Sequence, residues 1–93
     1  MPYTYLVQCA DNSYYAGWTT DLQARVKAHN SGRGARYTRS RRPVQLVYWE
    51  IQPTQSAAQQ REAAIRRKSH TQKAAMVDAF EASRGSFEQD FSK

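Results

Sequence analysis

Three side chains in this sequence are of the types that can hydrolyse a phosphodiester bond. That reaction needs a base for the attacking water, positive charge for the transition state and usually a divalent metal ion. Tyr15 can act as the base if nearby cations favour its phenolate. Arg25 can hold the phosphate, and Glu62 can hold one Mg²⁺ or Mn²⁺ ion whose shell is completed by water and phosphate oxygens. Each residue type is common, so the hypothesis depends on the elements that position them.

A β-hairpin is expected first. Two runs rich in aromatic and other apolar residues flank a short polar stretch: residues 3–9 and residues 13–18. A two-residue loop would place Tyr5 and Tyr15 on opposite faces of the sheet. A three-residue loop at residues 10–12 pairs Tyr5 with Gly17 and brings the two tyrosines onto one face as diagonal neighbours. We predict the three-residue loop.

A helix is expected next, within residues 20–32. Thr20 and Gln23 have the spacing of a capping box. Arg25 and His29 lie four residues apart on one stripe of this helix, so two cationic or hydrogen-bonding groups point together. Judged by its place on the helix alone, His29 is expected to be partly exposed.

The rest of the chain predicts one more strand and two more helices. A basic loop at residues 32–43 precedes a strand at residues 44–50. Ser56 and Gln59 again have capping-box spacing and introduce the second helix. A third helix is expected at residues 71–80. We predict one domain over residues 1–80, followed by a polar, acidic and loosely held tail at residues 81–93.

Glu62 is the one charged residue in the core-facing stripe expected for the second helix. The stripe consists of Ala58, Glu62, Ile65 and Ser69. A carboxylate that faces the body of the protein needs a cation as its partner. An ion pair with a nearby arginine and ligation of a metal ion are about equally supported at this point.

Positive charge is concentrated before the C-terminal segment. The chain has 14 Lys and Arg against 8 Asp and Glu, and residues 1–77 hold 12 of the former and 4 of the latter. Arginine dominates two clusters, and its planar guanidinium suits phosphate. A nucleic acid is therefore the expected partner, with a merely solvated basic face as the alternative. The candidate nucleic-acid-binding residues are Arg33, Arg36, Arg39, Arg41, Arg42, Arg66, Arg67 and Lys68.

No stretch approaches the roughly 18 consecutive apolar residues of a membrane span, and the N-terminus lacks the regions of a secretory signal. The single cysteine, Cys9, can close no internal disulfide and lies in an apolar run, where cysteine usually packs in the core. We therefore expect a cytoplasmic protein without a membrane partner.

The order and spacing of the candidate residues resemble the GIY-YIG nuclease family. The matching positions are Tyr5 in YTYL, Tyr15 and Gly17 in YAG, Arg25, His29, and Glu62 in QREAAIRRK. The likeness covers about residues 3–77 and is greatest to the small stand-alone bacterial members. It implies an α/β fold with a three-stranded antiparallel sheet flanked by helices, in the order β-β-α-β-α-α. It also implies hydrolysis of DNA with one metal ion, and a cytoplasmic protein of this kind could associate with the nucleoid.

The resemblance further implies a role for each matching position. Tyr15 would be the general base, Tyr5 its hydrogen-bonding companion, Arg25 the transition-state cation, His29 an auxiliary group near the phosphate, and Glu62 the metal ligand. Tyr37 falls in a loop where family members often carry another active-site tyrosine.

The sequence departs from the family pattern downstream of the glutamate. Many members have an asparagine there, whereas this chain has none after Asn30. We also expect no appended DNA-binding domain, in which case affinity would come from the arginine clusters or from a partner protein. Two functions follow: a metal-dependent endonuclease or exonuclease, and a nucleic-acid-binding module of the same fold that cleaves poorly or not at all.

Overall fold

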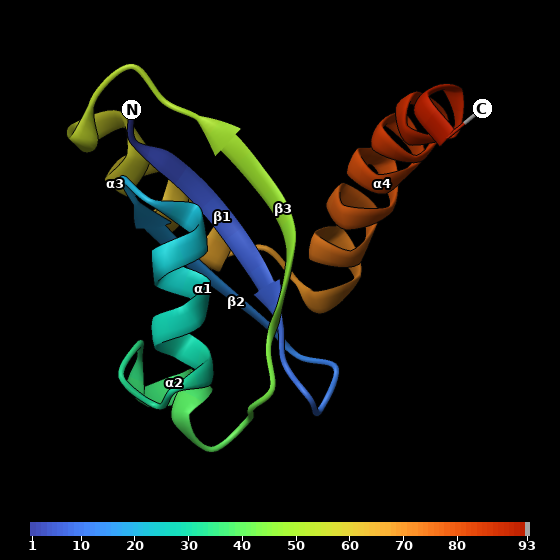
Figure 1. Cartoon of the computed structure of the whole chain (residues 1–93). Helices are drawn as coiled ribbons and strands as arrows, with labels where there is room; N and C mark the ends of the chain where they lie inside the picture. The colour runs from blue at the N-terminus through green and yellow to red at the C-terminus, as the bar shows by residue number, and fades with distance from the viewer. Residues whose placement is uncertain (93) are drawn as a thin grey trace.

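The computed structural model describes the backbone of residues 1–92 and the side chains of residues 1–83. Its centre is a three-stranded antiparallel sheet in the spatial order β2-β1-β3 (Figure 1). The elements along the chain are β1 (Tyr3–Gln8), β2 (Tyr14–Thr19), α1 (Leu22–Asn30), α2 (Arg36–Arg39), β3 (Gln45–Ile51), α3 (Gln55–Arg66) and α4 (His70–Ser92). The predicted α/β fold is confirmed, with the short helix α2 as an addition.

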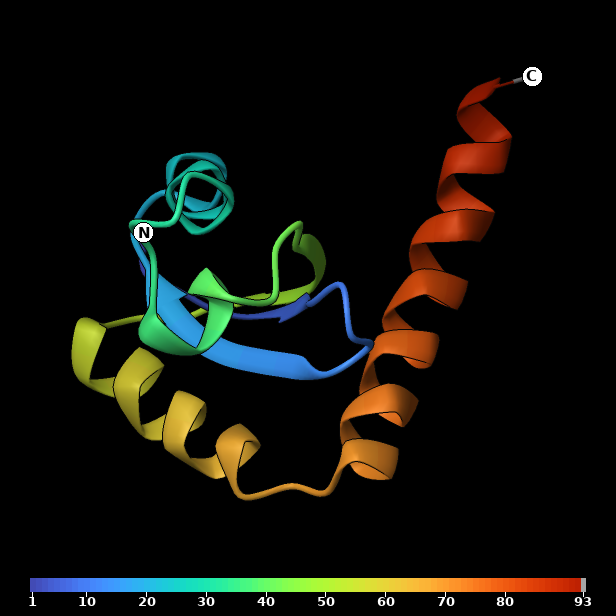
Figure 2. The same cartoon turned by 90° about the horizontal axis from the view of Figure 1, so that it is seen from below.

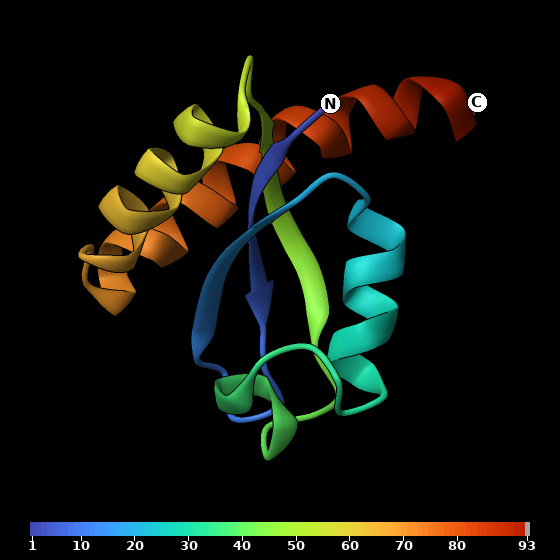
Figure 3. The ribbon, with the colours of Figure 1, turned by 90° about the vertical axis from the view of Figure 1, so that its left-hand side faces the viewer.

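Helices cover both faces of the sheet. α1 lies over one face, while α3 and the beginning of α4 lie against the other (Figures 2 and 3). β1 is the central strand, so β2 and β3 form the two edges. The edge strand β2 therefore has α2 on one side and α3 on the other, which brings elements distant in sequence to one place (Figure 2).

The β1–β2 hairpin has the predicted register. Tyr5 lies opposite Gly17, and Val7 lies opposite Tyr15. Asn12 takes a φ of 69° in the loop, a left-handed conformation that asparagine tolerates. Tyr5 and Tyr15 consequently belong to the same side of the sheet, as expected.

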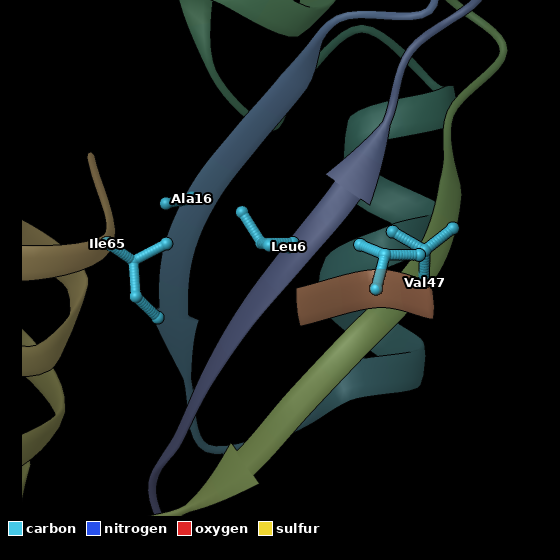
Figure 4. Packing of buried hydrophobic residues seen from close by; sticks show 5 residues of the cluster. Leu6, Ala16, Val47 and Ile65 are labelled. Carbon is cyan, nitrogen blue, oxygen red and sulfur yellow. The ribbon is translucent and has the colours of Figure 1, made fainter. Parts of the chain in front are cut away.

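The sheet divides the core into two clusters. The buried members on the side of α3 and α4 are Leu6, Ala16, Val47, Ile65 and Val77 (Figure 4). The buried members on the side of α1 are Tyr5, Val7, Cys9 and Val44, covered by Leu22 and Val26 of α1. The prediction that Cys9 packs in the core is confirmed, and Tyr5 is a core residue as well as a candidate for chemistry.

The two helix caps differ from those predicted. Asp21, not Thr20, caps α1, and its carboxylate accepts a hydrogen bond from the N–H of Ala24 at 3.0 Å. Thr54, not Ser56, caps α3 in the same way. Both caps have extended backbone, which an N-cap requires. Side-chain spacing alone does not reveal which of several nearby polar residues adopts that conformation.

The basic stretch at residues 32–43 contains one helical turn, α2, where only a loop was predicted. Thr38 stabilises this turn: its hydroxyl donates to the carbonyl of Ala35 at 3.1 Å and accepts from the N–H of the same residue at 3.3 Å. Hydrogen bonds of this kind compete locally with other backbone conformations. The sequence-based prediction was wrong here because residue propensities do not include them.

The last helix, α4, continues to Ser92, although the sequence predicted a helix ending at residue 80. The backbone at residues 81–92 is therefore helical, and the domain boundary at residue 80 stays a prediction. In the described part of the chain, no helix combines the length and the apolar character needed to cross a membrane.

Candidate active site

Tyr5 lies at the centre of the candidate site. Its Oη is hydrogen-bonded to His29 Nε2 at 2.8 Å and accepts a hydrogen bond from Arg25 Nε at 3.4 Å. Gly17, opposite on β2, leaves room for this hydroxyl, because a Cβ there would lie 2.4 Å from Oη. Burial raises the pKa of Tyr5 to about 12 against the lowering effect of Arg25, so the side chain stays a phenol at neutral pH.

His29 is fully buried, with 0% of its surface exposed, which corrects the expectation of a partly exposed helix residue. The loop after α1 folds back over the ring so closely that a Cβ at Gly34 would lie 2.2 Å from Nδ1. Nδ1 is hydrogen-bonded to Thr38 Oγ1 at 2.8 Å. Burial, helped by the charge of Arg25, lowers the pKa of His29 to about 4, so the imidazole is neutral at pH 7.

Arg25 points toward the same place from the preceding turn of α1. Its Nε donates to Tyr5, and its Nη2 donates to the carbonyl of Gly34 at 3.3 Å. The guanidinium is thus held between the sheet and the loop after α1. A hollow of about 350 Å³ beside it is lined by Trp18, Thr19, Thr20 and Arg25.

Tyr15 lies beside this cluster and is more accessible than Tyr5. Its ring meets the His29 ring edge-on at 5.5 Å and stacks on Tyr37 at 5.9 Å. The Arg41 guanidinium lies 3.9 Å from the centre of the Tyr37 ring. Tyr37 is 37% exposed, so the stack extends from the buried histidine to the surface.

Glu62 approaches from the opposite face of the sheet, on α3. It forms an ion pair with Arg66 one turn later, so the ion-pair alternative is realised in the structure. Arg66 also donates to the carbonyl of Ala16 on β2 at 3.2 Å, and its guanidinium lies 5.8 Å from the centre of the Tyr15 ring. The two faces of the sheet therefore meet around the edge of β2.

A pocket of about 490 Å³ occupies this edge. It is lined by residues of β2, α3, α4 and the segment around α2: Tyr14, Tyr15, Ala16, Ala35, Arg36, Tyr37, Arg66 and Lys73. Lys73, in the first turns of α4, was not among the predicted binding residues. Only its basic character could have indicated it, because its approach to the pocket depends on the turn between α3 and α4.

Of the predicted nucleic-acid-binding residues, Arg36 and Arg66 line this pocket. Six of the predicted arginines are exposed: Arg33, Arg36, Arg39 and Arg42 in and around α2, and Arg66 and Arg67 at the end of α3. Lys68, which follows them, is half-buried. Arg41 is engaged within the fold, since its Nε pairs with Asp11 at 3.1 Å. Arg61 is likewise engaged, since its Nη2 pairs with Glu50 Oε2 at 2.9 Å.

Comparisons with known sequences and structures identify the family of this α/β domain. Residues 1–75 match the GIY-YIG catalytic domain. A UPF0213 protein of Staphylococcus haemolyticus is 49% identical over 76 residues, which span 82% of this chain and 93% of the relative. A UPF0213 protein of Clostridium perfringens is 41% identical over 90 residues, or 97% of each chain.

The solution NMR structure of a UPF0213 protein from Bacillus halodurans shares 39% identity and a TM-score of 0.53 over 85% of both chains. A second solution NMR structure, from E. faecalis, shares 38% identity and a TM-score of 0.56 over 86% of this chain and 85% of the other. The chain belongs to the GIY-YIG family.

Proposed function

We propose that this chain is a metal-dependent nuclease that hydrolyses DNA phosphodiester bonds, with Tyr15 as the general base. The main support is the meeting of side chains around the edge of β2. Tyr15 comes from one face of the sheet, and Arg66, which holds Glu62, comes from the other, yet both line one pocket. A single phosphate in that pocket would lie beside the proposed base, Tyr15, and a cation, Arg66, which is itself paired with the Glu62 carboxylate.

Tyr15 suits the role of base better than Tyr5. Tyr5 is 1% exposed, burial raises its pKa, and its hydroxyl is engaged by both His29 and Arg25. Tyr15 is half-buried and lines the pocket, and Arg66 places positive charge beside its ring. In the proposed reaction the oxygen of water attacks phosphorus while its proton passes to the phenolate oxygen of Tyr15. The bond from phosphorus to the leaving sugar oxygen breaks, and that oxygen keeps the electron pair and takes a proton from water.

The other predicted catalytic residues act around this centre. Arg25 lines the separate hollow of Trp18, Thr19 and Thr20, not the pocket of Tyr15. It would stabilise the negative charge of a phosphate that extends toward that hollow, as a fixed guanidinium does without reorganisation. His29 is neutral and buried, so it would orient Tyr5 instead of supplying charge. Tyr37 would hold the exposed side of Tyr15 through their stack.

Glu62 would hold the divalent ion, Mg²⁺ or Mn²⁺. The site already stabilises a positive charge between two oxygens, because the Arg66 guanidinium bridges the Glu62 carboxylate and the Ala16 carbonyl. Carboxylate and carbonyl oxygens are also the donors that hard cations prefer, and Mg²⁺ commonly binds through one or two carboxylates with water and phosphate. When bound, the ion would supply Lewis-acid stabilisation of the phosphate and the leaving oxygen.

Cleavage assays with two matched pairs of variants test this function. Labelled single-stranded, duplex and branched DNA, and RNA, are incubated with the protein with and without Mn²⁺. Tyr15→Phe and Glu62→Gln should each abolish cleavage. Tyr48→Phe and Glu50→Gln are the controls. Tyr48 and Glu50 are also a half-buried tyrosine and a half-buried glutamate, but they lie on β3, where the tyrosine hydroxyl donates a hydrogen bond to the carboxylate. Cleavage that survives in Tyr15→Phe and Glu62→Gln would rule out the mechanism.

A nucleic-acid-binding module without cleavage is the second candidate. It is favoured by the engagement of Glu62 with Arg66, because the ion pair occupies the carboxylate that a metal ion would need. Salt-sensitive binding without products in any metal would support this function. In either case the partner would be DNA in the cytoplasm, at the nucleoid, with a second protein supplying targeting if the arginines alone do not.

A further inference from the structure

Thr38 is a buried polar residue that the proposed reaction does not use. It is 0% exposed and lies on the short helix α2. Its Oγ1 is hydrogen-bonded to His29 Nδ1 at 2.8 Å and to both the carbonyl and the N–H of Ala35. Ala35 lines the pocket. One hydroxyl therefore joins the imidazole to the backbone beside the proposed substrate site.

The hydrogens of this network can be assigned from the donors and acceptors present. Arg25 Nε can only donate, so Tyr5 Oη accepts from it. The hydroxyl hydrogen of Tyr5 then goes to the remaining partner, His29 Nε2. Nε2 consequently carries no hydrogen. Because the imidazole is neutral, its single N–H must be on Nδ1.

The same reasoning continues through Thr38. The Nδ1–H of His29 donates to Thr38 Oγ1, and the Thr38 hydroxyl hydrogen goes to the carbonyl of Ala35. The hydrogen bonds thus run in one direction, from Arg25 to Ala35. In this assignment each ring nitrogen of His29 and each of the two hydroxyl groups has a hydrogen-bond partner.

We propose that Thr38 is a positioning residue that fixes the Nδ1–H tautomer of His29 and thereby the direction of the Tyr5 hydroxyl hydrogen. With that hydrogen held by His29, the Tyr5 oxygen presents only lone pairs to Arg25. Without the Thr38 acceptor, Nδ1–H would face an apolar group, and the ring would gain by moving its hydrogen to Nε2. The Tyr5 hydroxyl would then turn its hydrogen toward Arg25 and weaken the hold on the guanidinium.

The consequence for catalysis rests on the proposed nuclease function, whereas the tautomer is a property of the free protein. Protein labelled with ¹⁵N at histidine contains two labelled rings, His29 and His70. Long-range ¹H–¹⁵N spectra at pH 7 should show a protonated Nδ1 and an unprotonated Nε2 for His29. Thr38→Val should shift the tautomer ratio about tenfold or more toward Nε2–H, because a buried donor without an acceptor is strongly disfavoured. Thr38→Ser should retain the wild-type tautomer.

Thr4→Val is the matched control. Thr4 is also 0% exposed, and its hydroxyl donates to the carbonyl of Ala58 at 2.9 Å on the α3 side of the sheet. It should lower stability by a similar amount and leave the His29 spectrum unchanged. If the protein cleaves DNA, Thr38→Val should lower kcat about tenfold to a hundredfold with little change in KM, as loss of an orienting group typically does. Thr4→Val should not change kcat.

Two results would overturn the proposal. One is a wild-type His29 with its hydrogen on Nε2, which is decisive even if Thr38→Val does not fold. The other is a folded Thr38→Val protein with the wild-type tautomer. Absence of cleavage in wild-type protein would refute the nuclease function and leave the tautomer assignment standing.

Discussion

Gly17→Ala tests the placement of Tyr5 by adding a single methyl group. The new Cβ would lie 2.4 Å from Oη, 2.6 Å from Cζ and 3.0 Å from Cε2 of Tyr5. Because ordinary contacts begin near 3.4 Å, the end of the ring must move by about 1 Å. Tyr5 is 1% exposed and has no free space, so this movement stretches its 2.8 Å hydrogen bond to His29 or its 3.4 Å bond to Arg25.

The expected loss of activity is larger than the expected loss of stability. Overpacking a core costs about 1–3 kcal/mol, while replacing glycine by alanine inside a strand gains about 0.5–1 kcal/mol. The net destabilisation of Gly17→Ala should be between about 0 and 2.5 kcal/mol, which most domains tolerate. A displacement of about 1 Å at a catalytic group costs about a hundredfold in rate. Metal-dependent cleavage should therefore fall about a hundredfold, while urea denaturation shows that the variant is still folded under the assay conditions.

A double-mutant cycle with Tyr5→Phe identifies the cause. If Gly17→Ala acts through the Tyr5 hydroxyl, it should lower activity much less in the Tyr5→Phe background. Full additivity of the two losses, or wild-type activity in Gly17→Ala, would refute the reasoning. Gly32→Ala is the control: its φ of +84° makes alanine strained by about 1–2 kcal/mol, but its Cβ would approach only the Arg42 side chain. It should lose stability and keep cleavage within a few-fold.

Three further predictions use stability and binding. The free energy of unfolding should fall by about 3 kcal/mol between about pH 6.5 and pH 4, because His29 stays neutral in the folded chain while it is protonated in the unfolded one. His29→Gln should flatten this dependence in pH-dependent denaturation, and His70→Gln should not. Lys73→Gln should lower the slope of log affinity for DNA against log salt by about 1, as loss of one phosphate contact does. Arg61→Gln, outside the pocket, should leave that slope unchanged, and equal effects of the two variants would contradict the assignment of Lys73. Burial tends to raise the pKa of Glu50, but hydrogen bonds from Arg61 and its neighbours hold it below its usual value. Arg61→Gln should therefore cost about 1 kcal/mol at pH 7, and denaturation at progressively lower pH should show this cost disappearing as the carboxyl of the folded protein protonates.

The parts of the site that follow from local periodicity could be predicted from the sequence. The loop length fixed the hairpin register, so Tyr5 and Tyr15 were placed on one face. The four-residue spacing of Arg25 and His29 placed both side chains together, and both contact Tyr5. These relations depend only on the two-residue repeat of a strand and the 3.6-residue repeat of a helix.

The parts that depend on segments folding over one another could not be predicted. Burial of His29 requires the loop after α1 to return across the ring, with Gly34 at the point of closest approach. The buried hydroxyl of Thr38 lay in a stretch whose composition indicated only a loop. Lys73 reaches the pocket because of how α4 follows α3. None of these contacts has a sequence period, since each joins elements through tertiary packing.

The edge position of the site explains how residues from two layers can act on one ligand. A ligand over the middle of a sheet meets side chains of one face only, because successive residues of a strand point to opposite faces. On β2, Tyr15 and Gly17 face α1 while Ala16 faces α3, and only at the edge can a ligand contact both sets. A slip of one residue in the β1–β2 register would turn Tyr15 toward α3 and Ala16 toward Tyr5. The three-residue hairpin loop, closed by the 2.8 Å hydrogen bond between the N–H of Cys9 and the carbonyl of Ser13, therefore determines the composition of the pocket as well as the fold.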